Sequence, residues 1–135
     1  MTAKEYLKRY RTLNAYIDCK LEEVAQLREL STRLSPTAMF DRNGNVSDKV
    51  GRTAAKIVDL EREIDREVDE LVKMRKEIEE TVSKIDDERF KTLLTMRYIN
   101  GYKWEKIALE MHYSYSSITY YLHPRALREV EKHMK

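Results

Sequence analysis

Apolar residues recur at helical spacing along the beginning of the chain. Over residues 2–34 they follow one another mostly at steps of three and four, which places them on one face of a helix. Thr2 and Glu5 form a capping-box pattern at the start, since each side chain can accept a backbone N–H. Pro36 ends the pattern, because proline lacks the N–H that a helix needs. The apolar face comprises Tyr6, Tyr10, Leu13, Ile17, Leu21, Val24, Leu27 and Leu34.

A second pattern, with a seven-residue period, runs from Asp48 to Ile85. Its repeating positions are Val50, Ile57, Ile64, Leu71, Ile78 and Ile85. A strict period of seven predicts a helix that supercoils with a partner helix. The first helix is the nearest candidate for that partner, and a second copy of the chain is the next. Ser35 to Ser47 separate the two patterns and predict a loop, with a tight turn at Asn43-Gly44.

The last fifty residues predict three shorter helices. Asp86-Asp87 can cap the first of them, and Asn100-Gly101 can end it. His112-Tyr113 form a very short turn after the second helix, and Ser114 can cap the third. The expected buried positions of the three helices are Phe90, Leu93, Leu94 and Tyr98, then Trp104, Ile107, Ala108 and Met111, then Ile118 and Leu122.

Two short helices joined by a tight turn are typical of a helix-turn-helix. Ala108 is small enough for the helices to cross closely, and Ile107 and Ile118 can pack in the angle between them. We therefore predict an all-α fold: residues 1–85 form a long antiparallel helical hairpin, and residues 86–135 form a small helix-turn-helix domain.

The outward side chains at the start of the third helix are the candidate contacts to DNA bases: Tyr115, Ser116, Ser117, Thr119 and Tyr120. The segment from Tyr115 to His123 has no Lys or Arg, so hydroxyl groups would have to read the bases. Phosphate contacts would come from Lys103, Lys106, Arg125 and Arg128. Pro124 is expected to kink or end the helix.

Four short pieces of this region carry a family resemblance: Arg97 to Gly101, Trp104 to Ala108, Tyr113-Ser114, and His123 to Leu127. They resemble the C-terminal half of sigma-70 region 4 and, more closely, the ArpU/RinA-like late-gene activators of phages of Gram-positive bacteria. The resemblance implies DNA binding in phage gene control, with RNA polymerase as a further partner. His123 falls at the histidine position of that family, although structural packing is the competing interpretation.

Composition and motifs bear on the nucleic-acid ligand, enzyme activity, cofactors, metals and location of the protein. A net charge of +2 does not by itself indicate a nucleic-acid ligand. No catalytic motif, cofactor motif or metal-ligand spacing occurs, and Cys19 is the single cysteine, so we expect no enzyme, cofactor or metal. We expect neither a membrane segment nor a signal peptide, and so a location in the cytoplasm of a bacterial host.

Two other functions stay open at this point. A small terminase-like packaging protein also combines a helix-turn-helix with an oligomerising hairpin. A helical adaptor would instead use the helix-turn-helix to bind protein. In each case the long second helix predicts a homo-oligomer, because its apolar positions extend beyond those of the first helix.

Overall fold

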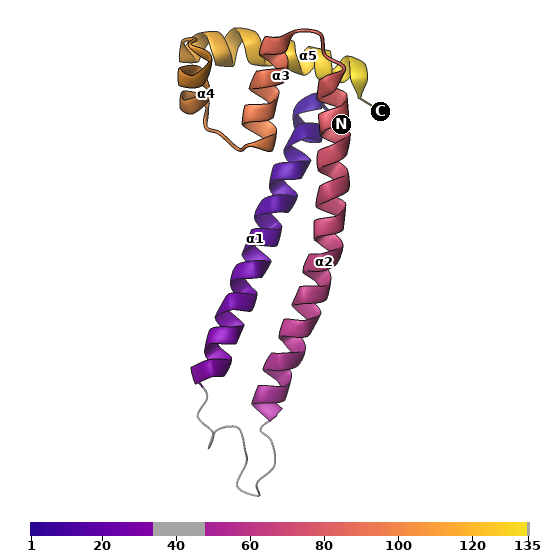
Figure 1. Ribbon diagram of the computed structural model, residues 1–135, viewed down its shortest axis with the longest axis vertical. Helices are drawn as coiled ribbons and strands as arrows, with labels where there is room; N and C mark the ends of the chain where they lie inside the picture. The colour runs from indigo at the N-terminus through magenta and orange to yellow at the C-terminus, as the bar shows by residue number, and fades with distance from the viewer. Residues whose placement is uncertain (34–47, 135) are drawn as a thin grey trace, which may run out of the picture. The chain divides into compact units, whose positions relative to one another are not determined.

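The computed structural model describes residues 1–33 and 48–134, and every regular element in them is a helix (Figure 1). The elements in chain order are α1 (Ala3–Arg33), α2 (Asp48–Ser83), α3 (Glu88–Leu94), the π-helical turn η1 (Thr95–Ile99), α4 (Trp104–Met111), the π-helical segment η2 (Ser117–Leu122) and α5 (His123–His133). The predicted all-α class is confirmed. The predicted loop at 35–47, its Asn43-Gly44 turn, and Leu34 lie outside the described residues.

The chain divides into two compact units. The terminal unit consists of Met1–Asn14 with Leu71–Lys135, and the middle unit is Ala15–Glu70. The terminal unit is therefore larger than the helix-turn-helix domain predicted over 86–135, since it also takes in the first turns of α1 and the last turns of α2. The boundary predicted at residue 85 does not coincide with the boundary between the units.

In the middle unit α1 and α2 pair in antiparallel directions through charged side chains. Lys20 Nζ lies 2.5 Å from Glu67 Oε1 and 3.2 Å from Glu63 Oε2. Further along α1, Glu23 pairs with Lys56 and Arg28 pairs with Glu61. The partners of Glu23 and Arg28 both lie nearer the start of α2 than the partners of Lys20, as an antiparallel pair requires. The buried apolar side chains of this unit are Ile17, Val24, Leu60 and Ile64.

The predicted face of the first helix needs one correction. Leu21 was expected to face inward, but it is 49% exposed, while its neighbour Lys20 is buried. The buried positions Ala3, Tyr10, Ile17 and Val24 are seven residues apart, so α1 follows the same period as α2. In that register Lys20 lies on the seam and Leu21 beside it. Cys19, expected beside the apolar face, is exposed.

In the terminal unit the short helices gather around the first turns of α1 and the last turns of α2 (Figure 1). The capping box is confirmed, with Glu5 N–H donating to Thr2 Oγ1 at 3.2 Å and Thr2 N–H donating to Glu5 Oε2 at 3.3 Å. Tyr6 Oη is hydrogen-bonded to Thr81 Oγ1 of α2 at 3.1 Å. One core joins these elements; its fully enclosed side chains include Leu7, Ile78, Ile85, Leu93, Leu94, Tyr98, Ile107, Ile118 and Val130.

Candidate nucleic-acid interface

The helix that precedes the interface begins and ends as predicted. Asp87 is the N-cap of α3, and its carboxylate accepts the backbone N–H of Arg89 at 2.9 Å. The Arg89 guanidinium also binds this carboxylate, at 2.8 Å, and holds the pKa of Asp87 below its usual value. Gly101 takes the left-handed conformation, with a φ of 73°, just after η1. This tight stop separates η1 from α4.

Helix α4 ends in a tight turn, at the place where a turn was predicted between the second and third short helices. His112 has a φ of 60°, in the left-handed region that residues other than glycine rarely adopt. Tyr113 N–H donates to Ala108 O at 3.1 Å, and His112 N–H donates to Leu109 O at 3.3 Å. These two bonds form a Schellman motif, which satisfies the last carbonyls of the helix and reverses the chain within two residues.

Ser114 caps the next helix, as predicted. Its Oγ accepts the backbone N–H of Ser117 at 3.1 Å and donates to Ser117 Oγ at 2.9 Å. Ile118 and Leu122 turn inward and are buried, together with Ala126 and Val130. This four-residue spacing fixes one inner face, so the opposite face of the helix is left for a partner.

The outer face of this helix is rich in hydroxyl groups. Tyr115 is 48% exposed and Tyr120 is 74% exposed, and Ser116 is also exposed. Ser117 and Thr119 are half-buried, and both hydroxyls are already engaged, the latter with Tyr115 O at 2.9 Å. Tyr115, Ser116 and Tyr120 are therefore the side chains most available to a ligand.

The predicted cationic residues flank that face along the chain. Lys103 and Lys106 are exposed at the start of α4, and Arg125 and Arg128 are exposed on α5. Lys106 Nζ lies 4.0 Å from the ring centroid of Tyr102, and the Arg125 guanidinium lies 5.9 Å from that of Tyr121. These contacts bury little of either side chain, so the charges face solvent.

His123 was included among the DNA contacts, and the structure places it in the core instead. It is 8% exposed and hydrogen-bonded through Nε2 to Tyr98 Oη at 2.7 Å. Burial, then the charges of Lys4, Arg97 and Lys8, lower the pKa of this imidazole to about 4. A neutral, enclosed imidazole cannot reach a DNA groove, so this residue has a packing role.

Pro124 was expected to kink or end the helix. It does not end it, because η2 continues directly into α5. The segment before it, Ser117–Leu122, is wound as a π-helix, and His123 N–H bonds to Ile118 O, five residues back. The proline then takes one of the first positions of α5, where its missing N–H costs little. The wider turn accommodates the ring that would otherwise clash with a carbonyl four residues earlier.

Four further cations near this region were not among the predicted contacts: Lys4, Lys8 and Arg11 on α1, and Arg97 on η1. The Arg97 guanidinium lies 4.5 Å from the ring centroid of Trp104 and donates to Tyr102 O at 3.0 Å. The sequence spacing of Lys4, Lys8 and Arg11 already places these three residues on one side of a helix. Nothing in the sequence indicated that these first turns pack beside the C-terminal helices.

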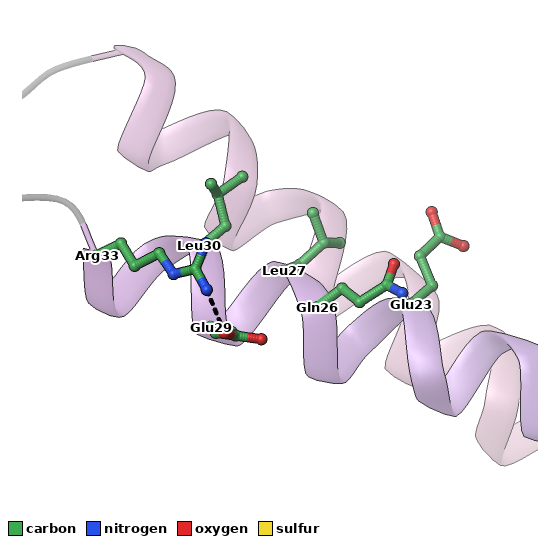
Figure 2. Close-up of a pocket in the computed structure, with 6 residues that line it drawn as sticks. All are labelled: Glu23, Gln26, Leu27, Glu29, Leu30 and Arg33. Atoms are coloured by element: carbon green, nitrogen blue, oxygen red, sulfur yellow. Dashed lines mark hydrogen bonds and ion pairs between the residues drawn. The ribbon is translucent and has the colours of Figure 1, made fainter.

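Other parts of the described structure provide weaker candidates for a functional site. The hollow on the last turns of α1 is lined by Glu23, Gln26, Leu27, Glu29, Leu30 and Arg33. The ion pair between its lining residues Arg33 and Glu29, at 2.6 Å, lies within a single helix (Figure 2). In the described ranges no group of His, Cys, Asp or Glu is placed to hold a metal ion, and no helix is long and apolar enough to cross a membrane.

No curated protein and no solved structure matches this chain. The family described as a protein of unknown function, DUF1492, matches residues 35–134. The match takes in α2 and all the shorter helices that follow it. The chain therefore belongs to the DUF1492 family.

Proposed function

We propose that this protein is a DNA-binding transcription regulator of the bacteriophage type, which reads duplex DNA through α4 and the helix that starts at Tyr115. The observation that carries the proposal is the geometry of that pair. A two-residue reversal at His112 and Tyr113 joins two helices whose inner faces share a core, and the second helix presents an exposed face. This is the arrangement by which a helix-turn-helix enters the major groove.

The side chains on the exposed face suit a particular kind of readout. Tyrosine and serine hydroxyls can donate to or accept from base edges, and aromatic rings can contact thymine methyl groups. Such contacts discriminate less sharply than an arginine on guanine. Attraction to phosphates would therefore supply most of the affinity, through the exposed Lys103, Lys106, Arg125 and Arg128. The resemblance to ArpU/RinA-like activators supports a role in phage late-gene control, with RNA polymerase as a second partner.

The direct test is selection of binding sites by the full chain from fragments of a phage genome. Fluorescence anisotropy on a selected duplex should give binding that weakens steeply as salt rises. Tyr120→Ala and Ser116→Ala should reduce preference for the selected site over random duplex. Tyr16→Ala, which removes an exposed tyrosine of the middle unit, is the matched control and should leave that preference unchanged.

Two outcomes would replace the proposal. Folded protein that binds no duplex at low salt but binds a host or phage protein would be an adaptor. Protein that binds DNA together with the large terminase subunit, and not with RNA polymerase, would belong to DNA packaging. Pull-down with both proteins as baits separates these two outcomes.

A further inference from the structure

We infer that the first turns of α1 carry a second DNA-contacting surface. Lys4, Lys8 and Arg11, together with Arg97 of η1, form a cationic face that binds phosphates of a duplex held by the helix-turn-helix. This inference rests on the proposed function and extends it to a part of the chain that precedes the family match at residues 35–134.

Helix geometry puts the three α1 cations on one side. They are four and three residues apart, the spacing of side chains that neighbour each other along a helix surface. Lys4 and Lys8 are exposed and Arg11 is half-buried. The other side of the same turns is buried: Ala3, Tyr6, Leu7 and Tyr10 belong to the core that contains Ile107 and Ile118. The cations are thus attached to a rigid part of the helix-turn-helix unit.

Arg97 joins these cations at the same place. Lys4, Lys8 and Arg97 are close enough to His123 that the positive charge of each lowers the pKa of its imidazole. Burial and then the charge of Arg11 lower the pKa of Arg97. Stacking on Trp104 and the hydrogen bond to Tyr102 O hold the Arg97 guanidinium in place. Four like charges from two elements therefore converge on one region.

These charges lack the carboxylate partners found elsewhere in the structure. In residues 1–33 and 48–134 no ion pair involves Lys4, Lys8, Arg11 or Arg97, although the charge of Glu105 acts on Arg97. Arg9, in the same turns of α1, lies 3.9 Å from Glu77 and stacks on Tyr6 at 4.7 Å. One side of α1 is thus neutralised within the protein, whereas the other keeps a positive potential that a polyanion would neutralise.

Duplex DNA is the occupant that fits the location. Tyr115, which begins the reading helix, lies close enough to Arg97 that its phenolate, once ionised, would raise the pKa of that guanidinium. The cationic face therefore borders the helix proposed to enter the major groove. Phosphates lie in continuous rows on both sides of that groove, so a protein with its reading helix inserted brings neighbouring cations against them. This face would also offset the lack of Lys and Arg from Tyr115 to His123.

The test compares two double variants of the full chain on one fluorescent duplex of mixed sequence. Lys4→Gln with Lys8→Gln removes two charges from the cationic face. Lys73→Gln with Lys76→Gln removes the same net charge from two exposed positions of α2 in the same unit. Binding is measured at several salt concentrations. The slope of log K against log salt is negative. The first variant should make it less steep by about 1.8, since each lost phosphate contact removes about 0.9 from its magnitude. The second should keep the slope of the unmodified protein.

The results separate this inference from the proposed function. If the unmodified chain binds DNA and the first variant keeps its full slope, the inference is overturned and the helix-turn-helix proposal stands. An equal loss in both variants would also overturn it, because net charge alone would explain the effect. No binding by the unmodified chain overturns both ideas. Circular dichroism and melting temperature check folding, and Lys4→Glu with Lys8→Glu should deepen the loss if the face contacts phosphate.

Discussion

The phenol oxygen of Tyr98 and Nε2 of His123 lie 2.7 Å apart in the core of the terminal unit. Their rings stack with centroids 5.9 Å apart, and Trp104 leans against the imidazole at 4.5 Å. The bond ties η1, which precedes α4, to the junction of η2 and α5, which follow α4. Burial raises the pKa of Tyr98 to about 12 and lowers that of His123 to about 4.

Acidification should destabilise the terminal unit through His123. The unfolded imidazole takes up a proton near its ordinary pKa of 6.5, whereas the folded one resists until about pH 4. The unfolded chain thus binds more protons across this window, and the free energy of unfolding falls as the pH drops from 6.5 to 4. The full loss would be about 3 kcal/mol. Urea unfolding followed by the fluorescence of Trp104, the single tryptophan, measures it.

His123→Gln is the control for that experiment, because an amide does not titrate in this range. The variant should be less stable at pH 7 and should lose the pH dependence between 6.5 and 4. Asp87 contributes only below this window, since its pKa is held under 3.8 in the folded chain. Equal stability of the unmodified chain at pH 6.5 and pH 4.5 would contradict the prediction.

Leu7→Ala should destabilise the core that α1 shares with the C-terminal helices, although Leu7 is far from them in sequence. Leu7 is 0% exposed and lies in the core with Ile107 and Ile118. Truncating a buried leucine typically costs about 2–5 kcal/mol. We therefore expect a lower urea midpoint for the Trp104 signal and weaker DNA binding. Thr12→Ala, at an exposed position of the same helix, should change neither measurement.

Lys20→Met should destabilise the antiparallel pair in the middle unit. Lys20 binds both Glu63 and Glu67, and Glu67 Oε2 is itself buried without a hydrogen-bond partner among residues 1–33 and 48–134. Removing the cation would leave two carboxylates together, one turn apart. Adding Glu67→Leu should recover the melting temperature, because an apolar contact replaces the buried charge. A higher melting temperature for Lys20→Met alone would show that the ion pairs do not stabilise this unit.

The full chain should form a dimer or larger oligomer through its long helices. In the middle unit Val58 and Val68 of α2 are 48% and 38% exposed, and Leu21 and Leu30 of α1 are also exposed. Val58→Ser with Val68→Ser should lower the mass measured by light scattering and keep the helical circular dichroism signal. Ile64→Ser, at a core position, should reduce helicity instead. A monomer mass for the unmodified protein at tens of micromolar would contradict this prediction.

Local signals in the sequence were enough to find the helices. The capping box at Thr2, the caps at Asp87 and Ser114, and the stops at Gly101 and His112 lie where nearby residues predict them. The inner positions Phe90, Leu93, Ile107, Ile118 and Leu122 are buried as expected. Each of these features depends on residues within a turn or two of one another, and that range is what periodicity and capping patterns describe.

The features that were missed depend on residues far apart in the sequence. Which of Lys20 and Leu21 faces inward is decided by the partner helix, because pairing imposes a seven-residue period on α1. His123 is buried because Trp104 and Tyr98 meet around it. That Leu7 shares a core with Ile107 and Ile118 cannot be read from either segment alone, so the extent of the terminal unit and the position of its cations were not predictable.

The Tyr6–Thr81 hydrogen bond joins residues 75 positions apart, and this separation has a consequence for how the protein folds. Closing so long a segment of free chain costs entropy, and structures dominated by distant contacts fold slowly. Pairing of α1 with α2 between residues 15 and 70 would shorten the segment that must close before the core containing Leu7 and Ile107 forms. The middle unit would then form before the terminal unit, and variants such as Lys20→Met should slow refolding of the chain as well as lower the stability of the middle unit.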